Sequence, residues 1–369
     1  MCITSKRVGV RTMESISAKP GLIVIGPSTI GSGDFADPYK RKTFYANGRF
    51  WVFWYDGYYV VYSTSTDGLV WASPTIVDSD FSETDFSIWF DGTYLHILAY
   101  SGGSLIYRRG IPNADGTITW VADKQFVTTG INGAVAVDSY GYVWVGYRSL
   151  YSPYYPYVTR SGNNDGTWGT TPVGFPLQLS TSSSSNWTVH IVPLTNGKTL
   201  VLYAYTTPIY ARLWNGSAWE GVTSTISAVY QGWDMEAVAE GDDVHIAFLK
   251  RTADFPFVGG IVYVKYTYLT NSFGDEVTLQ EDATTSPAIG IDKKTYLHIF
   301  WAGSPEGDAV YYLKGKPGAW TTPIKLLTAQ PIEGGLAGGN VCSFYKQYDK
   351  YMGLIYLASD GVRFVALKL

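Results

Sequence analysis

Acidic residues stand just ahead of two segments that the sequence predicts as strands. Glu83 and Asp85 precede one such segment, and Asp234 and Glu236 stand at the start of another. In most glycoside hydrolases, two carboxylates flanking the scissile bond supply the acid and the base or nucleophile. With His190, these four residues are the candidates for a glycan-cleaving site. Aspartates near strand starts also serve as turn and cap residues, so a structural role stays open.

Aromatic side chains favour binding instead of cleavage. The segment 149–156 reads SLYSPYYP and follows an arginine, and tyrosine rings held by proline give rigid surfaces for stacking on sugars or gripping a protein. Two tryptophans each open a strand beside a polar neighbour, which suits a binding platform. The candidate ligand-binding residues are Tyr151, Tyr154, Tyr155, Arg148, Trp187 and Trp233. The alternatives are packing against a neighbouring segment for the loop and filling of a central channel for the tryptophans.

A repeat of about 50 residues must position these side chains. Seven turn pairs each stand between two strand-forming segments, at 47–48, 91–92, 140–141, 196–197, 241–242, 293–294 and 349–350. The second members of these pairs are 44, 49, 56, 45, 52 and 56 residues apart. A third and an outer strand follow in most units; in the third unit the outer strand is predicted at 169–174. The pattern predicts an all-β fold, a β-propeller of about seven four-stranded blades.

The two ends of the chain are predicted to meet. The seventh unit ends at Leu369 after its third strand, and an extra apolar segment, 21–26, precedes the first unit. We expect this segment to pair with the strand near 363–367 and to supply the outer strand of blade seven, which would remove an exposed sheet edge. Residues 20–369 are then one propeller domain, and residues 1–19 form an N-terminal arm.

Residues 65–71, STDGLVW, resemble the Asp-box of the bacterial-neuraminidase repeat found in sialidase-like propellers. The family pattern is Ser-x-Asp-x-Gly-x-Thr-Trp, so this copy is one residue short and lacks the Thr. Residues 161–168 and 214–219 look like more degraded versions at the same place. The resemblance implies that Asp67 caps backbone amides of the turn and that Trp71 packs between blades.

The resemblance does not extend to a sialidase active site, because this sequence lacks most of the residues that such a site uses. Sialidases use three arginines for the substrate carboxylate, a tyrosine nucleophile helped by a glutamate, and an aspartic acid. Only Arg41 lies at a comparable strand start, and the proline-containing motif that normally follows is replaced by Lys42-Thr43-Phe44.

Three of the four histidines recur at one position of the repeat. His96, His245 and His298 are each the third residue of a predicted second strand, so they diverge around the ring and are expected to be structural. His190 lies in a predicted inner strand, nearer the channel. Cys2 and Cys342 are far apart and form no CxxC pair, so neither a metal site nor a disulfide framework is indicated.

Composition excludes several classes of function. Twenty-seven basic and 31 acidic residues give a net charge of −4, which argues against nucleic-acid and membrane-surface binding. No apolar run is long enough to span a bilayer, and residues 1–19 do not resemble a signal peptide. The low content of charged residues, 16%, with many Ser, Thr, Tyr, Asn and Gly, is common on extracellular and virion proteins. No cofactor is expected.

Two functions remain open from the sequence. The first is a non-catalytic propeller that binds a glycan or a protein surface, with an extracellular or virion-associated location. The second is a glycan-cleaving hydrolase or polysaccharide lyase that uses acidic residues over the central channel. The enzyme requires two or more titratable groups that converge in one pocket over the channel, and the binding protein does not.

Overall fold

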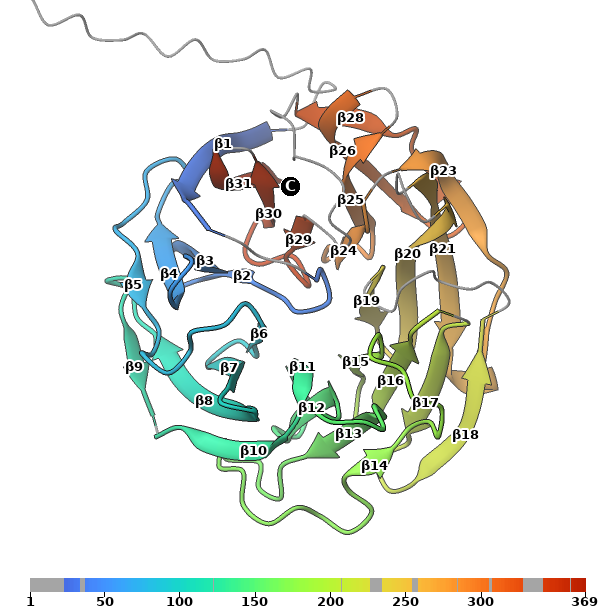
Figure 1. The fold of residues 1–369 in the computed structure, drawn as a ribbon. Coiled ribbons are helices and arrows are strands. Elements are labelled where there is room, and N and C mark those ends of the chain that lie inside the picture. Colours follow the sequence, from blue (N-terminus) through green and yellow to red (C-terminus); the bar gives the residue numbers. More distant parts are fainter. Residues whose placement is uncertain are drawn as a thin grey trace, which may run out of the picture.

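Seven antiparallel β-sheets surround a central axis in the computed structural model (Figure 1). The structure describes residues 23–369 except 34–36, 122, 207, 226–233, 254–257, 284, 305–306, 328–340 and 359. Each sheet is a blade whose strands follow one another outward from the axis. The predicted all-β, seven-bladed propeller is therefore confirmed. The N-terminal arm, residues 1–19, lies outside the described residues.

The first four blades end near residue 224. Blade one contains β2 (Thr43–Ala46), β3 (Arg49–Tyr55), β4 (Val60–Ser65) and β5 (Thr75–Ile76). Blade two contains β6 (Phe86–Phe90), β7 (Leu95–Ser101) and β8 (Ser104–Pro112), with β9 (Ile118–Trp120) and β10 (Gln125–Thr129) both paired to β8. Blade three contains β11 (Ile131–Val137), β12 (Val143–Arg148), β13 (Pro156–Arg160) and β14 (Leu177–Gln178). Blade four contains β15 (Thr188–Pro193), β16 (Thr199–Ala204), β17 (Tyr210–Trp214) and β18 (Trp219–Ser224).

The last three blades complete the ring. Blade five contains β19 (Met235–Glu240), β20 (Asp243–Ala253), β21 (Val258–Thr267), the 3-10 helix η1 (Tyr268–Thr270), β22 (Ser272–Phe273) and β23 (Val277–Ala283). Blade six contains β24 (Ala288–Ile291), β25 (Leu297–Ser304), β26 (Gly307–Lys316), β27 (Ala319–Trp320) and β28 (Ile324–Leu327). Blade seven contains β29 (Val341–Ser343), β30 (Tyr351–Ala358), β31 (Gly361–Lys368) and β1 (Ile23–Gly31). Within these ranges no helix is long and apolar enough to cross a membrane.

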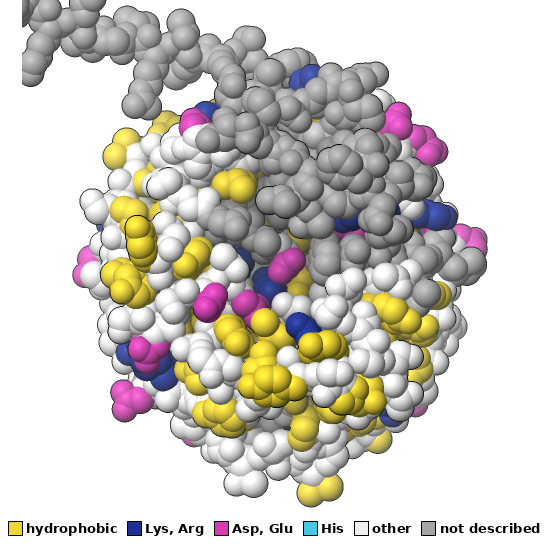
Figure 2. Space-filling view, viewed as in Figure 1, with side chains coloured by type: hydrophobic (Ala, Val, Ile, Leu, Met, Phe, Trp, Pro, Cys, Tyr) yellow, Lys and Arg dark blue, Asp and Glu magenta, His cyan; other side chains and the backbone are white. Residues whose placement is uncertain are grey.

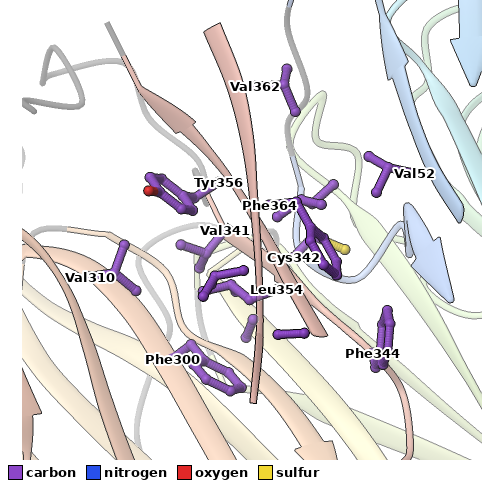
Figure 3. Close-up of a cluster of buried hydrophobic side chains, with 14 of the residues drawn as sticks. Val52, Phe300, Val310, Val341, Cys342, Phe344, Leu354, Tyr356, Val362 and Phe364 are labelled. Atoms are coloured by element: carbon purple, nitrogen blue, oxygen red, sulfur yellow. The ribbon is translucent and has the colours of Figure 1, made fainter. Parts of the chain in front are cut away.

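Side chains of a second strand alternate between two hydrophobic cores, because neighbouring blades cover both faces of each sheet. In β3, Trp51 and Phe53 pack with side chains of blade two. Phe50, Val52 and Trp54 point the other way and join a core shared with blades six and seven, part of which is shown in Figure 3. Consecutive residues 50–54 of β3 are therefore all apolar, because they contact two different cores in strict alternation.

The ring closes between the two ends of the chain, as predicted. β1 pairs antiparallel with β31, with Ile23 opposite Lys368 and Thr29 opposite Arg363. The pairing extends to Gly31, beyond the predicted segment 21–26, of which residues 21 and 22 lie outside the described part of the chain. Blade seven thus takes its outer strand from one end of the sequence and its other three from the opposite end.

The turn after β4 clasps this closing strand. Asp67 accepts hydrogen bonds from two backbone N–H groups of the turn, at 2.8 and 2.9 Å. The indole N–H of Trp71 donates to the Ser28 hydroxyl at 2.9 Å, and that hydroxyl donates to the Gly68 carbonyl at 2.6 Å. The Trp71 ring meets Phe364 of β31 edge-on at 5.1 Å. Blade one is therefore held to blade seven by both polar and aromatic contacts.

The outer strand of blade three is not at the predicted position, 169–174. The structure places it at β14, and the preceding chain forms a turn in which the Phe175 N–H donates to the Pro172 carbonyl at 3.1 Å. The Phe175 ring packs on Trp144 at 5.4 Å and on Trp214 at 5.6 Å. This aromatic packing, together with a proline that cannot donate to a ladder, outweighs the strand propensity of the segment.

The three repeated histidines are buried in one kind of hydrogen-bonded bridge. His96 lies between the Asp91 carboxylate at 2.9 Å and a tyrosine hydroxyl at 2.7 Å. His245 is held in the same way by Glu240 at 2.9 Å and Tyr263 at 2.7 Å. His298 repeats the arrangement with Asp292 and Tyr312. In blade three a tryptophan takes the histidine position and donates to Asp138 at 2.8 Å. Each bridge ties the inner turn of its blade to the second and third strands.

We expect removal of β1 to open the ring. Deleting residues 1–31 exposes the β31 edge and part of the core shared by blades seven and one, so the melting temperature should fall by about 10 °C or more. Deleting only residues 1–19 leaves β1 intact and serves as the control. Thermal unfolding followed by circular dichroism distinguishes the two; equal melting temperatures would refute the closing role of β1.

Burial lowers the pKa of His245, although Glu240 acts against this shift. The unfolded chain therefore binds more protons than the folded chain as the pH falls through about 6.5, and stability is lost in that range. In the variant His245→Gln, the free energy of unfolding should be lower at pH 7.5 but should decline less between pH 7.5 and 5.5. Urea unfolding at several pH values measures both; an unchanged pH dependence would contradict the interpretation.

Candidate functional site

We call the mouth face the side of the ring that carries the loops into the inner strands and the loops between second and third strands. The segment Asp37–Lys42, here the plug segment, lies at its centre, and Figure 1 shows the chain before β2 reaching into the ring. Residues 38–42 are all buried. Their contacts reach blades two, four, five, six and seven, so this one loop joins most of the ring.

Arg41 makes the widest set of these contacts. Its guanidinium lies 2.5 Å from the Glu236 carboxylate of blade five and donates to the Ala237 carbonyl at 2.7 Å. It also donates to the Ile289 carbonyl of blade six at 3.2 Å and lies 4.9 Å above the Tyr345 ring of blade seven. Burial raises the pKa of Glu236, while Arg41 and the Ile289 N–H act in the opposite direction. The pair is a structural connection between blades.

Lys40 and Lys42 join the plug segment to blade two. Lys40 lies 2.8 Å from Asp37 and 2.6 Å from Asp85, and the second oxygen of Asp85 accepts the Asn132 N–H at 2.6 Å. Burial lowers the pKa of Lys40, but the two carboxylates outweigh this and the net shift is upward. Lys42 donates to the Phe86 carbonyl, and burial lowers its pKa to about 7.

Tyr39 and His190 stack in the centre of the ring. Their ring centroids are 4.1 Å apart, and both side chains line a cavity of about 20 Å³ that extends to Trp89 and Glu236. This volume holds about one water molecule. Burial raises the pKa of Tyr39, so its phenol is neutral at physiological pH. This cavity, bounded by the described residues, is therefore too small to hold a sugar.

The loop of residues 149–156 stands on the mouth face beside the plug segment and is held by its own hydrogen bonds. The Ser149 N–H donates to the Tyr155 carbonyl at 2.9 Å, and the Tyr155 N–H donates to the Ser149 hydroxyl at 2.9 Å. Two further bonds join Tyr154 to the segment 180–186: its N–H donates to the Ser183 hydroxyl, and its carbonyl accepts from the Ser184 N–H. Tyr151 at the tip is 72% exposed. The loop thus presents an aromatic ring from a fixed backbone.

Arg148 stands at the base of this loop. Its guanidinium lies 4.8 Å above the Tyr154 ring and donates to the Ser149 carbonyl at 3.2 Å. Within the described ranges, no carboxylate is at ion-pair distance from it, unlike Arg41 and Arg251. Figure 2 shows acidic, basic and hydrophobic side chains gathered near the centre of this face. Arg148 is a half-buried cation that no carboxylate of the described residues contacts directly. Burial lowers its pKa, and the nearby Asp85 carboxylate acts to raise it.

The remaining predicted residues differ in their surroundings. Asp234 is buried, 2.6 Å from Arg251 and 2.8 Å from the Ser286 hydroxyl, and Glu83 is exposed. Trp187 is 1% exposed, and its indole N–H donates to the Ser182 carbonyl at 2.9 Å. Trp233 lies outside the described residues. The structure therefore brings Arg148, Tyr154 and Tyr155 together and places Trp187 beneath the surface.

Sequence reasoning missed Tyr39, Lys40 and Lys42. The available signal was the run Tyr39-Lys40-Arg41-Lys42, an unusual concentration of charge just before an inner strand of a chain with few charges. Arg41 was considered only for a substrate carboxylate, and it instead faces Glu236. Among the described residues no three His, Cys, Asp or Glu side chains are grouped so as to hold a metal ion.

Comparison of the sequence with known protein families and with curated proteins finds no match. Solved structures share the fold at low identity. The BP39L lectin from Burkholderia pseudomallei has a TM-score of 0.63 at 13% identity, covering 94% of this chain and 97% of the lectin. An ulvan lyase, a polysaccharide lyase, has a TM-score of 0.59 at 11% identity, covering 93% and 95%. The NanB sialidase from Streptococcus pneumoniae has a TM-score of 0.48 at 10% identity, covering 94% and 70%. The propeller fold is thus shared with lectins and glycan-processing enzymes.

Arg41→Met should destabilise the protein by about 3–5 kcal/mol, because it leaves the buried Glu236 carboxylate without its counter-charge. The double variant Arg41→Met/Glu236→Leu removes both charges and should recover part of this loss. Urea unfolding of the wild type and of the single and double variants measures the coupling. A single-variant loss below about 1 kcal/mol would show that the pair does not hold the blades together.

Proposed function

We propose that this protein is a non-catalytic propeller that binds a glycan on its mouth face, through Arg148 and the tyrosines of the loop 149–156. The observation that carries this proposal is a half-buried arginine without a carboxylate partner beside an exposed tyrosine on a hydrogen-bonded loop. Tyrosine supplies a flat apolar surface for the ring of a sugar, and the loop is ordered before binding, which reduces the entropic cost.

The charge of Arg148 favours an acidic glycan. A planar guanidinium binds carboxylate and sulfate-like groups through two parallel hydrogen bonds. Burial lowers the pKa of Arg148, but an arginine remains charged at neutral pH. A bound uronic or sialic acid carboxylate would form the direct ion pair that no carboxylate of the described residues makes with Arg148. This restricts the proposed ligand to glycans with an anionic group near one end or along the chain.

Cleavage is less well supported than binding, because three of the four candidate carboxylates already have structural partners and the fourth, Glu83, is exposed. Asp85 is held by Lys40 and a backbone N–H, Asp234 by Arg251, and Glu236 by Arg41. A glycoside hydrolase needs two carboxyl groups that face the substrate, one of them free to give up a proton. Tyr39, with its raised pKa, is a poor base at neutral pH. The lectin and the lyase that share the fold are compatible with either function.

An extracellular or virion-associated location is part of the same proposal, since acidic glycans are abundant on cell surfaces. The low proportion of charged residues and the many Ser, Thr and Tyr side chains support this location, as does the resemblance of residues 65–71 to an Asp-box. A sialidase-like ancestry without the sialidase arginines fits a propeller that has kept glycan binding alone.

An array of sialylated, uronic-acid-containing, sulfated and neutral glycans tests the proposal. Acidic glycans should bind, and both Arg148→Met and Tyr151→Ala should weaken the best of them at least tenfold, about 1.4 kcal/mol. Tyr140→Ala, which alters an exposed tyrosine on the opposite face of the ring, should leave affinity unchanged. Preference for neutral glycans, or full affinity of Arg148→Met, would overturn the assignment. New reducing or unsaturated ends in the bound glycan would show cleavage instead.

A further inference from the structure

A groove of about 480 Å³ lies between blades three and four, on the outer side of the segment 180–186. Gln178, Ser180 and Thr181 line one wall, and Tyr203, Tyr210 and Val222 line the other. It is far larger than the cavity in the channel, and it is open to solvent. A cavity of this size accommodates a small molecule, and its position does not coincide with Arg148 or with the plug segment.

The walls of the groove combine flat apolar surface with hydroxyl and amide groups. Tyr203 and Tyr210 stack at 5.4 Å, and Trp187 lies behind Tyr203 at 5.8 Å, which fixes the orientation of the pair. Val222 is 51% exposed, so apolar surface faces the solvent here. The Gln178 amide is held by the Ser180 carbonyl at 2.9 Å. None of the residues that line the groove carries a charge.

This lining matches the chemistry of a neutral sugar. The C–H face of a pyranose packs on a tyrosine ring, while its hydroxyls exchange hydrogen bonds with serine, threonine and amide groups. A peptide partner would bury more apolar area than the exposed Val222 and the partly exposed Tyr210 provide, since Tyr203 is itself buried. An anionic sugar would find no cation among the lining residues. The lining is therefore suited to an uncharged polar ring.

The groove and the proposed glycan site border the same chain segment, 180–186. Ser183 and Ser184 make the hydrogen bonds that hold Tyr154, and Ser180 and Thr181 of the same segment line the groove. Thr181 and Ser183 are separated by one residue, so their Cα atoms are at most about 7 Å apart. The two sites thus lie on opposite flanks of one short segment.

We propose that the groove between blades three and four is a second carbohydrate site, which binds a neutral sugar residue beside the acidic-sugar site at Arg148. This inference extends the proposed function and rests on it for the class of ligand. It also explains why Trp187, buried beneath the segment, is surrounded by tyrosines: the indole supports the aromatic wall of the groove.

Saturation-transfer NMR with single sugars separates the two sites. The probes are rhamnose, fucose, galactose, glucose, mannose and N-acetylglucosamine as neutral sugars, and glucuronate as the acidic sugar. We expect at least one neutral sugar to bind the wild type. Val222→Trp fills the groove from an exposed position and should weaken that sugar at least tenfold while leaving glucuronate unaffected. Val277→Trp makes the same change at an exposed valine of the outer strand of blade five and is the matched control.

Arg148→Met is the reciprocal variant, and it should weaken glucuronate while leaving the neutral sugar bound. The assignment of the groove as a carbohydrate site is overturned if no neutral sugar binds the wild type. It is also overturned if the Val222→Trp variant binds the neutral sugar as well as the Val277→Trp variant does. If the neutral sugar binds and glucuronate does not, the groove remains a carbohydrate site and the proposed acidic-sugar site at Arg148 is rejected. Both variants alter a partly exposed side chain, and their melting temperatures verify that the fold is retained.

Discussion

The Arg41–Glu236 pair is the contact on which the arrangement of the blades depends. Seven blades leave an axial space that their inner strands cannot fill, and a plug segment from a single loop fills it. A buried charge is tolerated only with a partner and with hydrogen bonds to its remaining atoms. Arg41 meets this condition with one carboxylate and two carbonyls from blades five and six. Its position therefore fixes blades far from it in sequence.

Within three of the blades, the strands are joined by a second kind of contact. The carboxylate–histidine–tyrosine bridges of blades two, five and six join the inner turn to the second and third strands, and all three partners are local in sequence. Between blades the contacts are mainly hydrophobic, because each sheet is covered on both faces. Local bridges shape the individual blades, and non-local packing with the closing strand β1 assembles them into a ring.

The use of acidic residues in the architecture limits the chemistry available on the mouth face. The acidic residues nearest the axis are used by the architecture, since Asp85, Asp234 and Glu236 each neutralise a cation. Among the described residues, the mouth face also carries the loop 149–156, whose backbone is ordered by hydrogen bonds and whose Tyr151 side chain reaches the surface. Such a face is suited to recognising a shape and a charge. The segment 180–186 holds the loop at Tyr154 and also lines the groove at Tyr210, so one element borders both proposed sites.

From the repeat period along the chain we could predict the seven units, the closure by an N-terminal strand and the structural nature of His96, His245 and His298. The sequence pattern misplaced the outer strand of blade three, where Phe175 packs on distant aromatic rings. The absence of a carboxylate in contact with Arg148 among the described residues could not be predicted in this way. The pairing of Glu236 with Arg41 and the stacking of Tyr39 on His190 could not be predicted either. These pairings join residues more than a hundred positions apart. They depend on how blades meet across the axis, and a local period carries no information about that geometry.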